Sequence, residues 1–121
     1  MLRSPRAAVY FRPRSPLPLE PLISPWMGES DWWSECADAI LNAGLDLIAW
    51  TDFLHSTELA LRHPQCAQVH ATDDISTNHL CPANAEVRRY TAAVASSLSH
   101  YGISVLECES LCYGPAGHTH H

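Results

Sequence analysis

Residues 84–109 constrain the fold most, because a long amphipathic helix leads there directly into a strand. Apolar side chains recur every three or four residues along this stretch, at Val87, Tyr90, Val94, Leu98 and Tyr101, as on the buried face of a helix. The spacing predicts a helix over 84–101, capped by Asn84 and stopped by Gly102. A buried strand over 103–109 follows, and so short a helix-to-strand connection is typical of α/β units.

A second helix and two more strands are predicted upstream. The helix begins near Ser30 or Asp31 and ends at Gly44. Its apolar face comprises Trp33, Cys36, Ala37, Ile40 and Leu41. Residues 45–50 are predicted to form a strand that runs on toward Asp52, and residues 7–11 to form a first strand. The prolines between these elements make 12–28 an extended, Pro-rich loop.

Residues 53–83 have the weakest periodicity. A short helix is predicted over 56–62, ended by His63-Pro64, and 65–82 show no clear period. We therefore expect 53–83 to be a long loop between a strand and the helix that follows it. The resulting order alternates strands with helices, which predicts one α/β domain over 1–121 with parallel strands and right-handed crossover helices.

Composition excludes several classes of protein. The chain has a net charge of −6 and seven Arg but no Lys, which argues against nucleic acid as a partner. No apolar run reaches the ~18–20 residues that span a bilayer, so no membrane association is expected. Five glycines without a GxGxxG motif give no dinucleotide site, and we expect no cofactor.

The cysteines and the N-terminus favour a cytoplasmic protein. Five cysteines without paired spacing are not a disulfide framework. Cys36 and Cys108 are expected to be small buried hydrophobes on a helix and a strand, which fits a reducing compartment. Arg12 and Arg14 interrupt the apolar region that a signal peptide would need, although an upstream segment absent from this sequence could carry one.

Glu107 and Glu109 are the first candidates for chemistry. They are two residues apart on a predicted strand, so their side chains share a face. One carboxyl group acting as general acid beside an ionised one is the arrangement that glycoside hydrolysis uses. The alternative is that one of the two glutamates pairs with an arginine on a neighbouring strand.

Trp50, Asp52 and His55 lie at or just after the end of the preceding strand. The carboxyl ends of parallel strands lie at the same edge, so these residues are expected close to Glu109. The Trp50 ring could stack on a sugar, and Asp52 or His55 could hydrogen-bond its hydroxyls. The alternative is a core tryptophan beside a capping aspartate.

The C-terminal residues His118, His120 and His121 are weak candidates for metal binding through their imidazole nitrogens. The alternative is a flexible terminal tail or the remnant of a purification tag.

Several segments resemble one known family. Cys81-Pro82-Ala83-Asn84-Ala85-Glu86-Val87-Arg88-Arg89-Tyr90 and Tyr101–Glu109 resemble a helix opening and the following strand in glycosyl-hydrolase-like (β/α)8-barrel proteins of bacteria. Ile48-Ala49-Trp50 and His63-Pro64 resemble an earlier strand and its loop. The match is closest to an uncharacterised branch that ends its strand in Leu-Glu-Ser and continues into a His-rich segment, here Glu109-Ser110 and 117–121, which argues against a tag.

The resemblance covers residues 45–121, and 8–44 more weakly, and implies a barrel in which Glu109 takes the place of the family's strand-end acid. Two positions depart from the family pattern: Ser104-Val105 stands where Asp-Gly is usual, and the strand-end acid is Glu rather than Asp. The substrate does not carry over from the family.

A length argument adds to this resemblance. A complete barrel has about 250 residues and eight strands, whereas this chain supplies about three strands and two main helices. The expected fold is therefore a partial TIM-type (β/α) barrel, completed by another chain or by a homo-oligomer.

Three functions remain open at this stage. The first is a glycoside-hydrolase-like barrel fragment that acts on or binds a carbohydrate or another small molecule, with Glu109 and Glu107 as catalytic carboxylates. The second is a non-catalytic module that binds carbohydrate or a partner. The third is a metal-dependent barrel hydrolase or isomerase that uses the two glutamates and the terminal histidines.

Overall fold

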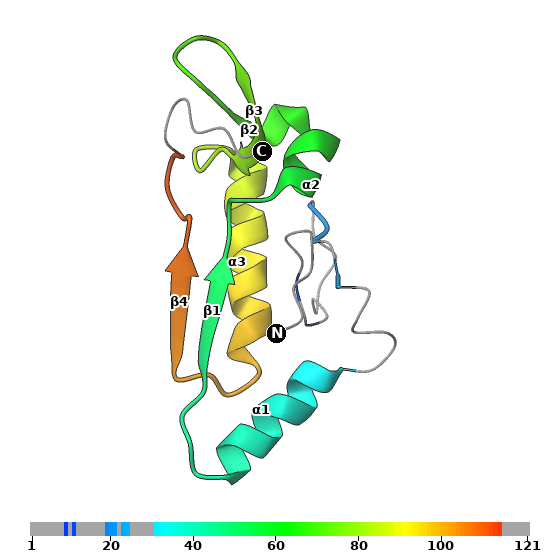
Figure 1. Ribbon diagram of the computed structural model, residues 1–121, viewed down its shortest axis with the longest axis vertical. Helices are drawn as coiled ribbons and strands as arrows, with labels where there is room; N and C mark the ends of the chain where they lie inside the picture. The colour runs from blue at the N-terminus through cyan, green and yellow to red at the C-terminus, as the bar shows by residue number, and fades with distance from the viewer. Residues whose placement is uncertain (1–8, 10, 12–18, 22, 25–30, 115–121) are drawn as a thin grey trace.

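The computed structural model describes residues 9, 11, 19–21, 23–24 and 31–114, and they form a mixed α/β structure (Figure 1). In chain order the elements are α1 (Trp32–Asn42), β1 (Ile48–Asp52), α2 (Thr57–Arg62), the 3-10 turn η2 (Pro64–Cys66), β2 (Ala67–Val69), β3 (Ile75–Leu80), α3 (Ala85–Ser99) and β4 (Val105–Glu109). None of the helices among these residues is long and apolar enough to cross a membrane.

β1 and β4 form a parallel pair, as the alternation of strands and helices predicts. Helix α3 leads into β4 through a short turn and lies next to β1 in Figure 1. The apolar stripe of α3 is buried, with Val87 and Val94 almost inaccessible to solvent. They share a core cluster with Phe53 of the segment after β1, and Leu106 of β4 packs against it. One face of the parallel pair is therefore covered.

The ends of α3 follow from local chemistry. The side chain of Asn84 accepts hydrogen bonds from the backbone N–H groups of Glu86 and Val87, at 2.8 and 3.3 Å, which satisfies two donors that have no partner within the helix. Beyond the helix, Gly102 has φ +73°, a left-handed conformation that glycine adopts at little cost. The chain can therefore reverse and start β4 directly.

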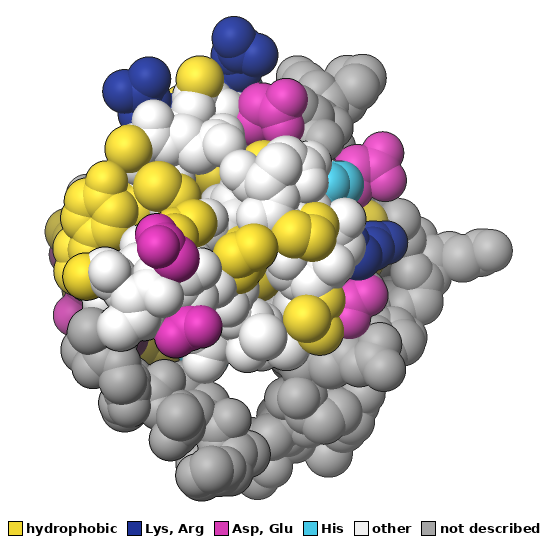
Figure 2. Space-filling model, turned by 90° about the horizontal axis from the view of Figure 1, so that it is seen from above, with side chains coloured by type: hydrophobic (Ala, Val, Ile, Leu, Met, Phe, Trp, Pro, Cys, Tyr) yellow, Lys and Arg dark blue, Asp and Glu magenta, His cyan; other side chains and the backbone are white. Residues whose placement is uncertain are grey.

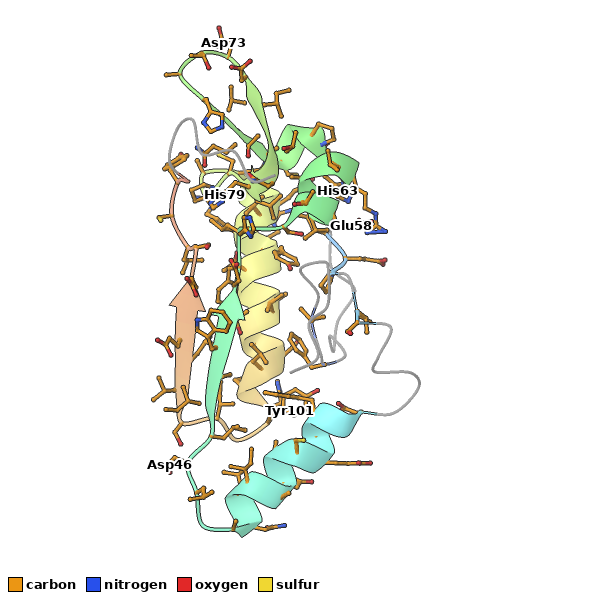
Figure 3. All side chains as sticks on the ribbon, in the orientation of Figure 1. Asp46, Glu58, His63, Asp73, His79 and Tyr101 are labelled. Carbon is orange, nitrogen blue, oxygen red and sulfur yellow. The ribbon has the colours of Figure 1, made fainter. Side chains whose placement is uncertain are left out.

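Helix α1 is confirmed, but its predicted burial is only partly right. Asp31 caps it through Ser34 N at 3.4 Å, and Tyr101 contacts it by donating to Asp31 Oδ2 at 3.4 Å (Figure 3). Ala37 is buried, whereas Cys36 is exposed.

The expectation of buried thiols at Cys36 and Cys108 was therefore wrong, since Cys108 is exposed as well. Cys108 lies on β4, the strand at the edge of a two-stranded sheet, where little covers it. The fully buried thiol is that of Cys66, which donates to Glu86 Oε2 at 3.5 Å. Burial raises the pKa of the Cys66 thiol, and the nearby Glu86 carboxylate raises it further by a smaller amount.

The predicted long loop over 53–83 is wrong beyond its short helix, which α2 confirms. Residues after α2 form an antiparallel hairpin of β2 and β3. Its buried positions include Gln68 and Ser76, and polar residues there hide the alternation that would signal a strand. Their polar atoms have partners, because Ser76 Oγ donates to Asn78 Oδ1 at 3.0 Å and Gln68 bonds Gly114.

The predicted strand 7–11 and loop 12–28 lie largely outside the described residues. Val9 forms an isolated parallel bridge with Ile23, and Ser24 N donates to Val9 O at 2.9 Å. Phe11 is buried in the core cluster. The buried Phe11 therefore places this described part of the N-terminal region against the core cluster.

Candidate functional site

One face of the β1–β4 pair is uncovered, and we call it the open face. Side chains alternate along each strand, so Ala49 is 2% exposed toward α3 whereas Trp50 is 65% exposed on the other side. The open face consists of Ile48, Trp50, Asp52, Val105, Glu107 and Glu109. The candidate carboxylates and the candidate tryptophan therefore lie on one surface.

The register of the two strands brings these residues together in rows. Trp50 is the partner of Glu107, and Asp52 is the partner of Glu109. Neighbouring strands lie about 4.8 Å apart, so each row places two side chains in direct proximity. Two of the carboxylates, Asp52 and Glu109, form the last row, at the carboxyl ends of both strands. β1, the strand that pairs with β4 among the described residues, reads Ile-Ala-Trp-Thr-Asp and offers no arginine partner to either glutamate.

The open face changes character along its length. Its first row pairs Ile48 with Val105, which are 56% and 52% exposed, and its last row is acidic. Seen from the end toward which the strands point, carboxylates and hydrophobic side chains are interspersed over the described surface (Figure 2). An apolar base below an acidic upper end is therefore the electrostatic pattern of this sheet.

His55 also lies at the acidic end, as its position after the strand predicts. Its Nδ1 is 3.6 Å from Asp52 Oδ2, and the two side chains are each 34% exposed. An isolated antiparallel bridge with His79 of β3 holds the backbone of His55 in place. The histidine can therefore hydrogen-bond a ligand that lies beside Asp52.

A cavity of about 440 Å³ opens beside β1, next to the acidic row. Asp52, His55 and Trp50 contribute to its lining. The rest of the wall is mainly apolar and includes Phe11, Trp33, Phe53, Leu59, Tyr90 and Leu98. The open face is thus continuous with a partly open recess.

Tyr90 is the residue of this site that sequence reasoning placed only in the core. It is almost fully buried, and burial together with the nearby Asp52 carboxylate raises the pKa of its hydroxyl to about 12. The phenol therefore stays protonated at neutral pH and can donate a hydrogen bond. A tyrosine flanked by aliphatic residues in a helix stripe is the sequence signal for such a role, because its polar tip needs a partner when buried.

The metal-binding candidates His118, His120 and His121 lie outside the described residues. Within the part of the chain that the structure describes, no group of three or more His, Cys, Asp or Glu side chains is arranged to hold a metal ion.

Neither a protein-family model, nor a curated protein, nor a solved structure matches this chain. The resemblance to glycosyl-hydrolase-like barrels stays a prediction.

Proposed function

We propose that this chain is part of a glycoside-hydrolase-like (β/α) barrel that binds or cleaves a carbohydrate on the open face. The observation that carries the proposal is the register that joins Trp50 to Glu107 and Asp52 to Glu109 on one uncovered surface. Carboxylates accept hydrogen bonds from sugar hydroxyls, and the exposed indole offers an apolar ring face for stacking.

The gradient along the open face supports a barrel interior. Barrel interiors are filled by layers of branched apolar side chains, and catalytic residues collect at the carboxyl ends of the strands. Ile48 and Val105 form such an apolar layer, and the acidic row lies at the carboxyl ends. Helix α3 covers the opposite face, as an outer helix would.

The register also suggests how the acids divide their roles. Glycoside hydrolysis needs two carboxyl groups, one protonated as the general acid and one ionised. We assign this pair to Glu109 and Asp52, which are neighbours across the strands, with His55 beside Asp52 as a proton-exchange partner. Glu107, one row deeper and next to Trp50, would hold the sugar.

The proposal includes completion by further strands. Two parallel strands supply a quarter of the eight that close a barrel, and β1 and β4 form a two-stranded sheet among the described residues. A second copy or another chain with further strands would enclose the open face and exclude water from it.

Hydrolysis of a panel of p-nitrophenyl glycosides tests the assignment. We expect measurable turnover by the wild type and a loss of at least about 100-fold in kcat/KM for Glu109→Gln, which removes the acid but keeps its shape. The matched control is Glu35→Gln on α1, an exposed carboxylate away from the open face, and it should leave turnover unchanged. Equal turnover in Glu109→Gln and wild type would refute the catalytic role.

A non-catalytic carbohydrate-binding module is the second candidate. It is favoured by the exposure of Glu107 and Glu109 on the described surface, since catalysis by carboxylates gains from exclusion of water. Binding of methyl glycosides, followed by NMR titration, without any turnover of the p-nitrophenyl series would select this function over hydrolysis.

A further inference from the structure

The cavity beside β1 differs in chemistry from the open face that it adjoins. Its volume of about 440 Å³ lies within the range of about 300–1,000 Å³ typical of small-molecule sites. Away from the acidic row its wall is apolar, with Phe11, Leu59 and Leu98 buried in the structure. A sugar placed against this apolar part of the wall would lose hydration of its hydroxyls and regain few hydrogen bonds, which is costly.

Two residues belong to both surfaces. Trp50 and Asp52 are part of the open face and also line the cavity. A ligand that contacts the acidic row can therefore extend past Asp52 into the recess without leaving the protein surface. Ala49, whose side chain points away from the open face, lines the recess as well, so side chains from both faces of β1 contribute to the cavity.

We propose that the site takes amphipathic glycosides, with the sugar on the open face and an alkyl or aryl aglycone in the cavity. This inference rests on the proposed function and specifies its substrate class. The aglycone gains by burial among Phe11, Leu59 and Leu98. The hydroxyl of Tyr90, held protonated by its surroundings, adds no charge to the wall that an apolar group would meet.

A chain-length series on the wild-type protein tests the inference without any mutation. Methyl, butyl, hexyl and octyl glycosides of glucose, galactose, mannose and xylose are titrated below their micelle concentrations, and Kd is measured by NMR or calorimetry. Each buried methylene is expected to lower Kd by up to about fourfold, and hexyl should bind at least about tenfold more tightly than methyl. Equal Kd along the series for a sugar that binds would overturn the inference and leave the proposed function standing.

Two variants then locate the aglycone. Thr51→Leu enlarges a side chain that lines the cavity. It should reduce the ratio of the methyl Kd to the hexyl Kd by at least about threefold. The Kd of the methyl glycoside should stay unchanged. The matched control, Ala92→Leu, enlarges an exposed side chain that lines a separate apolar cavity on the other side of α3, and should leave the whole series unchanged. If Kd falls from methyl to hexyl glycoside by the same factor in Thr51→Leu as in the wild type, the aglycone binds elsewhere and the proposed cavity site is refuted.

Glu109→Gln separates this inference from its premise. The substitution should raise the Kd of the methyl and hexyl glycosides of one sugar by the same factor, because Glu109 contacts only the sugar in the proposed complex. Failure of every methyl glycoside to bind, together with hexyl binding that Glu109→Gln leaves unchanged, would show that the cavity holds an apolar chain only. That result would refute the proposed function and the glycoside inference together.

Discussion

Single residues of this protein take their chemistry from a neighbour on another element. Tyr90 belongs to the apolar stripe of α3, yet its hydroxyl lies close enough to Asp52 of β1 for that carboxylate to affect its ionisation. Burial is the larger cause and the carboxylate the smaller, and together they raise the pKa of Tyr90 to about 12. A side chain that fills the core thus also places a neutral donor in the cavity.

The raised pKa of Tyr90 predicts a loss of stability at high pH. The folded state holds the phenolic proton more tightly than the unfolded state, whose pKa is near 10. The stabilisation is therefore complete below pH 10 and is lost as the pH rises through 12. Two pKa units correspond to about 3 kcal/mol of unfolding free energy.

Urea unfolding between pH 9 and pH 12 measures this loss. Tyr90→Phe is the control, because it keeps the ring but has no proton to release, and its stability should fall less steeply over that range. The interpretation is wrong if wild type and Tyr90→Phe lose stability in parallel.

At the scale of elements, polar contacts join the β2–β3 hairpin to the segment that follows β4. The Gln68 amide donates to Gly114 O at 3.0 Å and accepts from Gly114 N at 2.8 Å. His79 Nε2 donates to Cys112 O at 2.9 Å (Figure 3). The hairpin, which sequence periodicity did not reveal, thereby fixes the chain just beyond the acidic row.

Gln68→Ala is expected to lower the free energy of unfolding by about 1–3 kcal/mol, because it leaves both polar groups of Gly114 without their partner. Denaturant unfolding measures the change. Gln65→Ala is the matched control, since the Gln65 side chain is exposed and surface substitutions cost within about 0.5 kcal/mol. Similar losses in both variants would contradict a specific role for the Gln68 contacts.

At the scale of the whole molecule, the parallel sheet has one covered face and one open face, and this asymmetry bears on association with other chains. Helix α3 and the core cluster support one side, whereas Ile48, Trp50 and Val105 remain more than half exposed on the other. Exposed apolar groups favour association with further chain, as do the outer edges of β1 and β4, which pair with no other strand among the described residues. The two-stranded sheet is thus a surface suited to a second copy.

Sedimentation at increasing protein concentration is expected to show self-association of the wild type. The double variant Ile48→Thr, Val105→Thr should remain monomeric, because it removes the apolar row of the open face. Ile75→Thr, at a side chain that is 55% exposed on the hairpin, is the matched control and should associate like the wild type.

Salt provides a second test of the same contact. The carboxylates of the open face would repel one another across such an interface, so added salt should strengthen association by screening them. A wild type that is monomeric at every concentration would refute this interface and completion by a second copy.

Local sequence rules account for much of the fold. The apolar repeat of α3, the cap at Asn84 and the left-handed Gly102 act within a few residues, so helix and strand could be predicted together. The hairpin could not, because its buried positions Gln68 and Ser76 are polar and are satisfied by tertiary contacts.

The candidate site divides in the same way. The sequence alone determines that Glu107 and Glu109 share a face, since side chains alternate along any strand. Only the tertiary structure decides that Asp52 faces Glu109 and that Trp50 faces Glu107. That register joins strands far apart in the sequence, and packing against α3 sets it rather than any local preference. The cavity beside Asp52 likewise exists only once helices, strands and the N-terminal residues pack together.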